Sequence, residues 1–384
     1  MKRKLAAVMA CMMAFSAVAP CTVSASAAEE DFVIAVTTPI SEEYGAAAVQ
    51  TLDILQEKIN SEGGVNGANL RFEYIDALGI ADQQGYYSAI EKAVNTEGVC
   101  GIIGSYYDAV VTGYADVIDN AKIPCFNFLN GTEATALSEY FWSQRIPQDS
   151  IGSILTQLIA DSGSQHPVII LHDVDTWHSV AGNISDYYEA NGMSVAKELV
   201  YTDTTTDYAN LILDAMNVAD ADGIVLLCNA GTDGTTFLQT LDNYGYEYPI
   251  VTTSNVFSDT FAENTGAEAC EPVIGYSDFP TGYDREETLE FIDLLENGKY
   301  DYAISWLNAV YWDAALLMIE AAKIKGENSA EAVQAGLWEI EDFGGVMCDY
   351  TCHSNQYFPM QAYVATFSGT NVVCTGEIEI SYEE

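Results

Sequence analysis

Residues 60–67 read NSEGGVNG and lie between a helical pattern and a strand pattern. The pair Gly63-Gly64 ends the helix, because glycine readily adopts the left-handed backbone angles needed at a helix C-terminus. Strands are expected over Asp31–Val36, which is short and apolar, and over Leu70–Ile75. In the helix, apolar residues recur at helical spacing: Ala47, Ala48, Leu52, Leu55 and Ile59. This order of elements predicts the opening of a parallel α/β sheet.

Strand and helix patterns alternate along most of the chain, which predicts parallel sheets with helices on both faces. The first series continues with helix Asp82–Asn95, strand Val99–Gly104, helix Val110–Asn120 and strand Ile123–Phe128. A second series follows Arg145-Ile146-Pro147: strand Val168–Leu171, helix Ser179–Asn191, strand Ala196–Tyr201, helix Tyr208–Val218, strand Gly223–Cys228, helix Thr235–Asn243 and strand Pro249–Thr253. Two similar lobes are therefore expected. Beyond them we predict helices Glu286–Glu296, Ser305–Lys325 and Ala330–Glu341, then a hairpin of Tyr363–Phe367 with Val372–Ile380.

The first 28 residues have the features of an export signal. The basic residues Lys2–Lys4 precede the apolar run Leu5–Val18, and Ala25-Ser26-Ala27 offers a small-residue cleavage site. A lipid anchor at Cys21 is the alternative, although Pro20 departs from the usual lipobox. No later segment is long and apolar enough for a membrane helix, so we expect an exported chain that is free or tethered by lipid.

The composition narrows the class of protein. The chain has 384 residues, more than the roughly 250–300 that one hydrophobic core usually supports, so two domains are expected. Its 57 acidic and 13 basic residues give a net charge of −44. Such a surface repels nucleic acid and anionic membranes, which excludes both as expected partners. The simplest role of the excess charge is to keep the protein soluble.

No catalytic, metal or cofactor site is predicted. The chain contains no G-x-S-x-G elbow, H-E-x-x-H helix or glycine-rich phosphate loop, and its four histidines are scattered. Cys348, Cys352 and His353 superficially suggest a metal site, but no second Cys/His pair has zinc-site spacing. Export permits disulfides, yet one sequence leaves their connectivity open. Cys100 and Cys125 begin consecutive strands and are therefore candidate neighbours.

Two motifs carry a family resemblance. Residues 59–67 follow the pattern I-N-x-x-G-G-[IV]-x-G, and residues 311–315 read YWDAA. Both resemble landmarks of the leucine/isoleucine/valine-binding protein family, the type I solute-binding proteins of ABC importers, and the likeness extends over essentially the whole mature chain. The resemblance implies two Rossmann-like, doubly wound lobes joined by a three-segment hinge. It places the crossings near Ile146–Asp149, Gly275–Pro280 and Phe343–Val346.

These crossings divide the chain into residues 29–147 with 278–344 in an N-terminal lobe and residues 148–277 with 345–384 in a C-terminal lobe. The function implied is extracellular capture of a small polar solute by hinge closure, followed by recognition by a membrane ABC permease. We expect a monomer without catalytic activity. A secreted subunit that senses a ligand for a membrane receptor is the alternative, because it would have the same fold and cleft.

Ligands of doubly wound sheets lie beyond the carboxyl ends of the strands, so the resemblance is followed there residue by residue. Asp108 stands where amino-acid binders place a serine that holds the ligand carboxylate; an aspartate favours a cation or a hydrogen-bond donor instead. Asn130 and Thr132 lie in the loop that grips the α-carboxylate, and Tyr44 and Tyr107 are candidate pocket walls. The alternatives are helix capping for Asp108 and Thr132 and core packing for Tyr44.

In the second lobe, Trp177 takes the place of a ligand-stacking tyrosine, with packing on its own lobe as the alternative, and Asn229 follows the strand that ends at Cys228. Ser254 stands where branched-chain receptors have a glutamate that neutralises the ligand ammonium. Trp306 matches a hinge-side aromatic residue, with core packing as its alternative. The usual ammonium-to-glutamate recognition is therefore not expected. A small amide, an amino acid held in another way, or an aromatic or purine-like metabolite suits this pocket.

Overall fold

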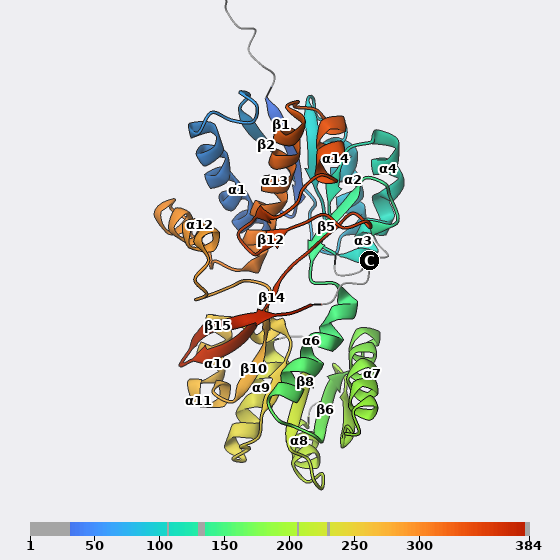
Figure 1. Ribbon diagram of the computed structural model, residues 1–384, viewed down its shortest axis with the longest axis vertical. Coiled ribbons are helices and arrows are strands. Elements are labelled where there is room, and N and C mark those ends of the chain that lie inside the picture. Colours follow the sequence, from blue (N-terminus) through green and yellow to red (C-terminus); the bar gives the residue numbers. More distant parts are fainter. Residues whose placement is uncertain (1–30, 106, 130–134, 206, 229–230, 381–384) are drawn as a thin grey trace, which may run out of the picture.

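The computed structural model of the chain describes residues 31–105, 107–129, 135–205, 207–228 and 231–380. They form two lobes, which Figure 1 shows one above the other. Strand β1 (Phe32–Thr38) lies inside the sheet of the first lobe, between β2 (Leu70–Asp76) and β3 (Val99–Ile103). All of its residues are buried, as expected of a strand that is covered on both faces.

The sheet of the first lobe is parallel throughout, in the order β13-β5-β4-β3-β1-β2. Its other strands are β4 (Cys125–Phe126), β5 (Phe141–Arg145) and β13 (Tyr357–Pro359). The helical elements of this lobe are α1 (Glu43–Ser61), α2 (Gln83–Ala93), α3 (Asp108–Val111), η1 (Thr112–Tyr114), α4 (Ala115–Ala121), α12 (Glu286–Asn297), α13 (Trp306–Lys325) and α14 (Ala330–Leu337). The single helix predicted over Val110–Asn120 is thus divided into α3, η1 and α4.

The sheet of the second lobe has the order β15-β14-β10-β9-β8-β6-β7, and only β14 runs opposite to the other strands, antiparallel to both β10 and β15. Its strands are β6 (Pro167–His172), β7 (Lys197–Tyr201), β8 (Gly223–Leu227), β9 (Ile250–Thr252), β10 (Val273–Ser277), β14 (Ala362–Ser368) and β15 (Asn371–Ile378). Its helical elements are α6 (Gln148–Asp161), α7 (Asp175–Ala190), α8 (Tyr208–Met216), α9 (Gly231–Asn243), η2 (Ser254–Val256), α10 (Asp259–Thr265) and α11 (Ala267–Cys270). The predicted architecture of two parallel α/β lobes is confirmed.

Several elements were not predicted, among them the consecutive pair β5 and α6. Strand β5 is polar at Ser143 and Gln144, which are nevertheless buried because backbone groups of Leu129 and Val310 bond to their side chains. Helix α6 did carry a readable pattern of apolar residues at helical spacing: Ile151, Ile154, Leu155, Leu158 and Ile159. No helix of the described ranges is both long and apolar enough to cross a membrane.

The chain passes between the two sheets three times, after β5, after β10 and after β13 (Figure 1). The third passage lies between Pro359 and Ala362, so its predicted position at Phe343–Val346 is wrong. The reason is that β13 pairs with β5 and keeps the chain in the first sheet as far as Pro359. Between those points, the short strands β11 (Phe343–Gly344) and β12 (Asp349–Tyr350) form a separate ribbon.

The NSEGGVNG segment ties three elements of the first lobe together. Gly64 has φ +76°, and a Cβ there would lie 1.9 Å from a backbone oxygen, so only glycine fits. The Asn60 side chain bonds both the N–H and the carbonyl oxygen of Leu70, at 2.7 and 2.9 Å, which fixes the start of β2. The Asn66 amide donates to a carbonyl oxygen of α13 at 3.0 Å. The segment therefore fixes the positions of α1, β2 and α13 relative to one another.

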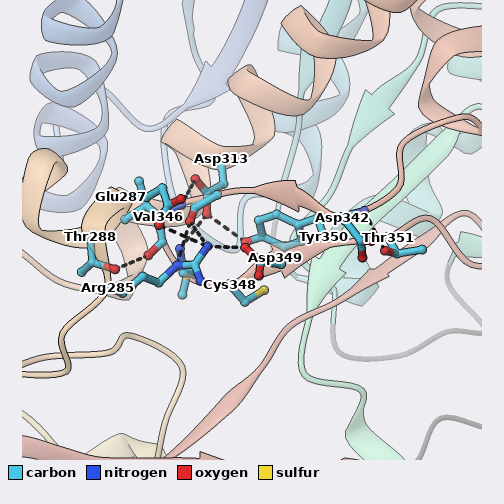
Figure 2. A network of polar contacts seen from close by, with 12 residues as sticks. Arg285, Glu287, Thr288, Asp313, Asp342, Val346, Cys348, Asp349, Tyr350 and Thr351 are labelled. Atoms are coloured by element: carbon cyan, nitrogen blue, oxygen red, sulfur yellow. Dashed lines mark hydrogen bonds and ion pairs between the residues drawn. The ribbon is translucent and has the colours of Figure 1, made fainter.

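Asp313 of α13 anchors the segment that precedes the third passage (Figure 2). Its buried carboxylate accepts the backbone N–H groups of Val346 and Met347, at 2.8 and 3.0 Å, and the Tyr350 hydroxyl at 2.9 Å. Burial raises the pKa of Asp313 to about 6, and these hydrogen bonds oppose the rise. The aspartate of the YWDAA motif is thus a structural anchor.

Arg285, next to α12, binds the same segment from the other side (Figure 2). Its Nε and one Nη donate to the carbonyl oxygen of Gly345 at 3.1 and 2.9 Å, and the same Nη lies 2.6 Å from Asp349. Tyr363 of β14 donates its hydroxyl to the Met347 carbonyl oxygen at 2.7 Å. Residues 345–349, which precede the third passage, are therefore bonded by both lobes.

Candidate functional site

A cavity of about 540 Å³ lies between the lobes. The first lobe contributes Tyr300, residues 302–306 and two residues of α12, and the second lobe contributes residues 257–260 and Val372. The end of β10 and the passage after it contribute Ser277, Phe279 and Thr281. This volume is within the range of small-molecule pockets, roughly 300–1,000 Å³. Because both lobes and a hinge segment line the cavity, a molecule held there touches both halves of the protein.

Trp306 reaches the cavity because of the way α13 begins. Ser305 caps the helix in a capping box with Asn308, and its backbone N–H donates to the Asn308 side chain at 3.0 Å. Trp306 is therefore the first residue of the helix, and its half-buried indole lines the cavity. The prediction placed Trp306 on the hinge side of a pocket, and the structure puts it at the junction of the lobes.

A buried ion pair joins the lobes beside Trp306. Arg145 ends β5 in the first lobe, and Asp278 directly follows β10 in the second. Their charged groups are 3.1 Å apart, with side chains 12% and 4% exposed. The guanidinium carbon also lies 4.2 Å from the centroid of the Trp306 ring, a cation–π contact. Arg145 thus connects the first two hinge passages to the aromatic wall of the cavity.

The end of β10 borders the cavity. Ser277, the last residue of this strand, lines the cavity, so its strand neighbour Tyr276 lies on the other face of the sheet. Burial raises the pKa of Tyr276, the Asp278 carboxylate adds to the rise, and hydrogen bonding with Ser254 opposes it. Burial likewise raises the pKa of Asp278, whereas Arg145 opposes this rise.

Several buried polar atoms near the lobe junction have no hydrogen-bond partner in the described part of the chain. They include Arg145 Nε, Asp278 Oδ1, Gln144 Oε1 and Thr253 Oγ1. Buried polar groups are normally bonded, because an unmade bond costs roughly 1–3 kcal/mol. The ion pair therefore leaves one donor and one acceptor unused where the lobes meet.

The structure brings some of the predicted site residues together. Ser254 opens η2 and lies against Tyr276, which in turn lies near Asp278 and Arg145. Trp306 contacts Arg145. Tyr107 is 42% exposed and directly precedes α3, whose first residue is Asp108, and Tyr44 is half-buried near the start of α1. Asn130, Thr132 and Asn229 lie outside the described residues.

Trp177 differs from its predicted setting. It was expected in a loop, but α7 begins at Asp175, so Trp177 is in the first turn of the helix. Only 7% of the residue is exposed, and it packs in the hydrophobic core. Its indole Nε1 is buried and lacks a hydrogen-bond partner in the described ranges. Core packing is thus a substantial part of what Trp177 does.

Arg145, Tyr276 and Asp278 were not among the predicted site residues. Each lies at or just beyond the end of a strand that leads into a hinge passage. Arg145 could have been recognised from the sequence as a candidate site residue, because it is one of only 13 basic residues and directly precedes the predicted crossing. Its partner was not recognisable, because Asp278 lies 133 residues further along the chain.

Within the described ranges, no three His, Cys, Asp or Glu side chains are grouped so that they could hold a metal ion. Cys348 and Cys352, with the adjacent His353, form no such group. The cysteines of these ranges are free, including Cys100 and Cys125 on the neighbouring strands β3 and β4.

Comparison with known proteins is consistent with this architecture. Residues 32–370 match the family model of periplasmic binding proteins. A Leu/Ile/Val-binding protein homologue (homolog 7) of Brucella abortus is 24% identical over 310 residues, which cover 76% of each chain.

Solved structures share the fold. The substrate-binding protein LivJ of a branched-chain amino acid transporter from Streptococcus pneumoniae, in complex with isoleucine, superposes with a TM-score of 0.75 at 18% identity. The match covers 91% of this chain and 99% of LivJ. A solute-binding protein of an ABC transporter from R. palustris, in complex with 4-hydroxybenzoate, gives a TM-score of 0.72 at 16% identity and covers 91% and 96% of the two chains.

Proposed function

Because this chain belongs to the periplasmic binding protein family, we propose that it is the extracellular solute-binding protein of an ABC transporter. It captures a small polar metabolite, such as an amino acid, an amide or a related compound, and presents it to a membrane permease. It acts as an exported monomer without catalytic activity. Residues 1–28 serve as the export signal, with Cys21 as the alternative lipid anchor.

The observation that carries this proposal is the cavity of about 540 Å³ lined by both lobes at the hinge. A ligand that contacts both halves stabilises the closed arrangement relative to the open one, and this difference in affinity drives closure. The permease then recognises the closed form. The three passages provide the axis of this movement, and Asp313 and Arg285 hold the segment that precedes the third of them.

The ligand contacts predicted from the sequence are kept in the proposal, and of those that the structure describes only Trp306 lines the cavity. From the first lobe they are Tyr44, Tyr107, Asp108, Asn130, Thr132 and Trp306, and from the second they are Trp177, Asn229 and Ser254. Ser254 leaves the position of the family glutamate without a charge, and Asp278 is a buried carboxylate near it. The ligands of LivJ and of the R. palustris protein, isoleucine and 4-hydroxybenzoate, support a search among amino acids and aromatic compounds.

A thermal-shift screen of the mature protein against amino acids, amides, nucleobases, aromatic acids and amines tests the proposal. A ligand at about 100 times its Kd adds about 2.7 kcal/mol to the stability of the folded state, which gives a measurable rise in Tm. Small-angle X-ray scattering with the best compound should then show a smaller radius of gyration. A tight ligand that leaves the scattering profile unchanged refutes capture by hinge closure.

A further inference from the structure

The cavity between the lobes has an acidic and aromatic lining. Glu296 and Asp259 contribute carboxylates, and the lining contains no Lys, Arg or His among the described residues. We infer that the solute is an organic cation, an amine or quaternary ammonium compound with an apolar or aromatic body. This inference rests on the proposed function and names the substrate class of the same cleft.

The two carboxylates come from different lobes. Glu296 lies near the end of α12 in the first lobe, and Asp259 begins α10 in the second. Asp259 accepts the backbone N–H of Val372 through one oxygen, at 2.8 Å, and its second oxygen is left for another donor. Glu296 has no hydrogen bond or ion pair in the ranges that the structure describes. A cation between them is attracted to both lobes and therefore favours closure.

The aromatic residues fit the same chemistry. The rings of Tyr300 and Tyr302 are in edge contact, with centroids 5.8 Å apart, and Phe257 also lines the cavity. Trp306 already binds one cation, because the Arg145 guanidinium lies 4.2 Å from its ring centroid. Aromatic faces attract ammonium groups, and several faces together form the cages that recognise quaternary ammonium compounds.

An anionic solute is disfavoured by the same lining. A carboxylate placed here meets Asp259 and Glu296, with no basic residue of the cavity wall to neutralise it. Arg145 contacts Trp306 but is paired with Asp278, so its charge is already balanced. A net charge of −44 on the chain further favours the approach of cations.

Isothermal titration calorimetry with a panel matched in size tests the inference. The panel contains 2-phenylethylammonium, phenyltrimethylammonium, phenylalanine, 3-phenylpropionamide and 3-phenylpropionate. The tightest binder should be one of the two cations, and its affinity should fall with added salt because part of the attraction is electrostatic. A zwitterion, neutral amide or carboxylate as the tightest binder overturns the inference.

Single variants test whether the charge and the aromatic faces of the cavity lining contribute to binding, without large changes to the fold. Glu296→Gln should weaken the cation about twofold to fivefold, the range expected of an exposed ion pair. Tyr302→Leu keeps apolar bulk, removes an aromatic face and should weaken binding by a similar factor. Glu263→Gln is the matched control, because Glu263 is exposed on α10 and does not line the cavity. Equal affinity of the Glu296 and Glu263 variants overturns the inference.

The outcomes for the two proposals are distinguishable. If the protein closes around a neutral or anionic compound, seen as a smaller radius of gyration, the solute-binding function is supported. Only the proposal of a cationic substrate is then refuted. A panel and library in which no compound raises Tm or changes the scattering refutes both.

Discussion

Replacing Arg145 with Met should reveal how strongly the ion pair at the lobe junction supports the fold. The variant keeps the apolar stem and removes the guanidinium. In the wild type the two charged groups are 3.1 Å apart, and the Asp278 side chain is 4% exposed. The variant leaves this buried carboxylate without a charged partner. Asp278 Oδ1 already lacks a hydrogen-bond partner among the described residues, so nothing there compensates for the loss.

The expected cost is large compared with that of a surface pair. Removing one partner of a buried ion pair costs about 3–5 kcal/mol, because the remaining charge stays buried. The lost contact with Trp306 adds about 0.5–2 kcal/mol. A folded domain is stable by only about 5–15 kcal/mol, so the variant should be close to the threshold of folding at neutral pH.

The deficit should depend on pH in a defined direction. In the folded protein the pKa of Asp278 lies above its ordinary value of 3.8, and without Arg145 it rises further. A group with a raised folded pKa contributes stability below its unfolded pKa and loses it as pH rises through the folded pKa. The difference in the free energy of unfolding between the wild type and the variant should therefore be smallest near pH 4 and largest at neutral pH.

Urea denaturation followed by tryptophan fluorescence at about pH 4.5 and 7.5 measures these differences. Arg71→Met is the matched control: Arg71 pairs with Asp31 and Glu73, and all three side chains are about 40% exposed or more, so its loss should cost about 0–1 kcal/mol. The double variant Arg145→Met/Asp278→Asn should regain most of the lost stability. A deficit below about 1 kcal/mol, or one that the double variant does not reduce, contradicts the ion-pair argument.

Three other changes test separate parts of the structure. Gly64→Ala should destabilise the protein more than Gly63→Ala: both have positive φ, which costs about 1–3 kcal/mol, but only Gly64 also meets a backbone oxygen, and equal urea midpoints would contradict this. Asp313→Asn removes a carboxyl group whose folded pKa is about 6 instead of 3.8, so the stability of the wild type relative to the variant should fall by about 2 kcal/mol between pH 4 and 7; a constant difference argues against a raised pKa. Trp177→Ala should cost about 3–5 kcal/mol in urea denaturation because Trp177 is 7% exposed, whereas Trp177→Phe should retain most of that stability; a fully stable alanine variant would show that Trp177 is not a core residue.

Local patterns were sufficient for much of the fold. Residue patterns within short stretches of the chain identified the strand Phe32–Thr38, the helix Glu43–Ser61 and the hairpin of β14 and β15. Gly63 and Gly64 mark the end of α1 because their backbone angles suit few other residues. The family resemblance was also local, since each motif is fewer than ten residues long.

The candidate site was less predictable. The structure has Ser254 just after a strand and Trp306 at the start of a helix, as the sequence predicted, but their contacts with Tyr276 and Arg145 were not anticipated. Trp177 was read as a loop residue because its burial depends on how α7 packs in the core.

The amino-acid sequence thus specified which segments become strands and helices and where glycine must end a helix. The pairing of β13 with β5, the ion pair of Arg145 with Asp278 and the anchoring role of Asp313 exist only in the folded chain. Each joins residues that no local period relates, because strands and hinge passages meet according to how whole lobes pack. The cavity between the lobes has the same origin: residues 257–260 and 300–306 become neighbours only when the two halves are in place.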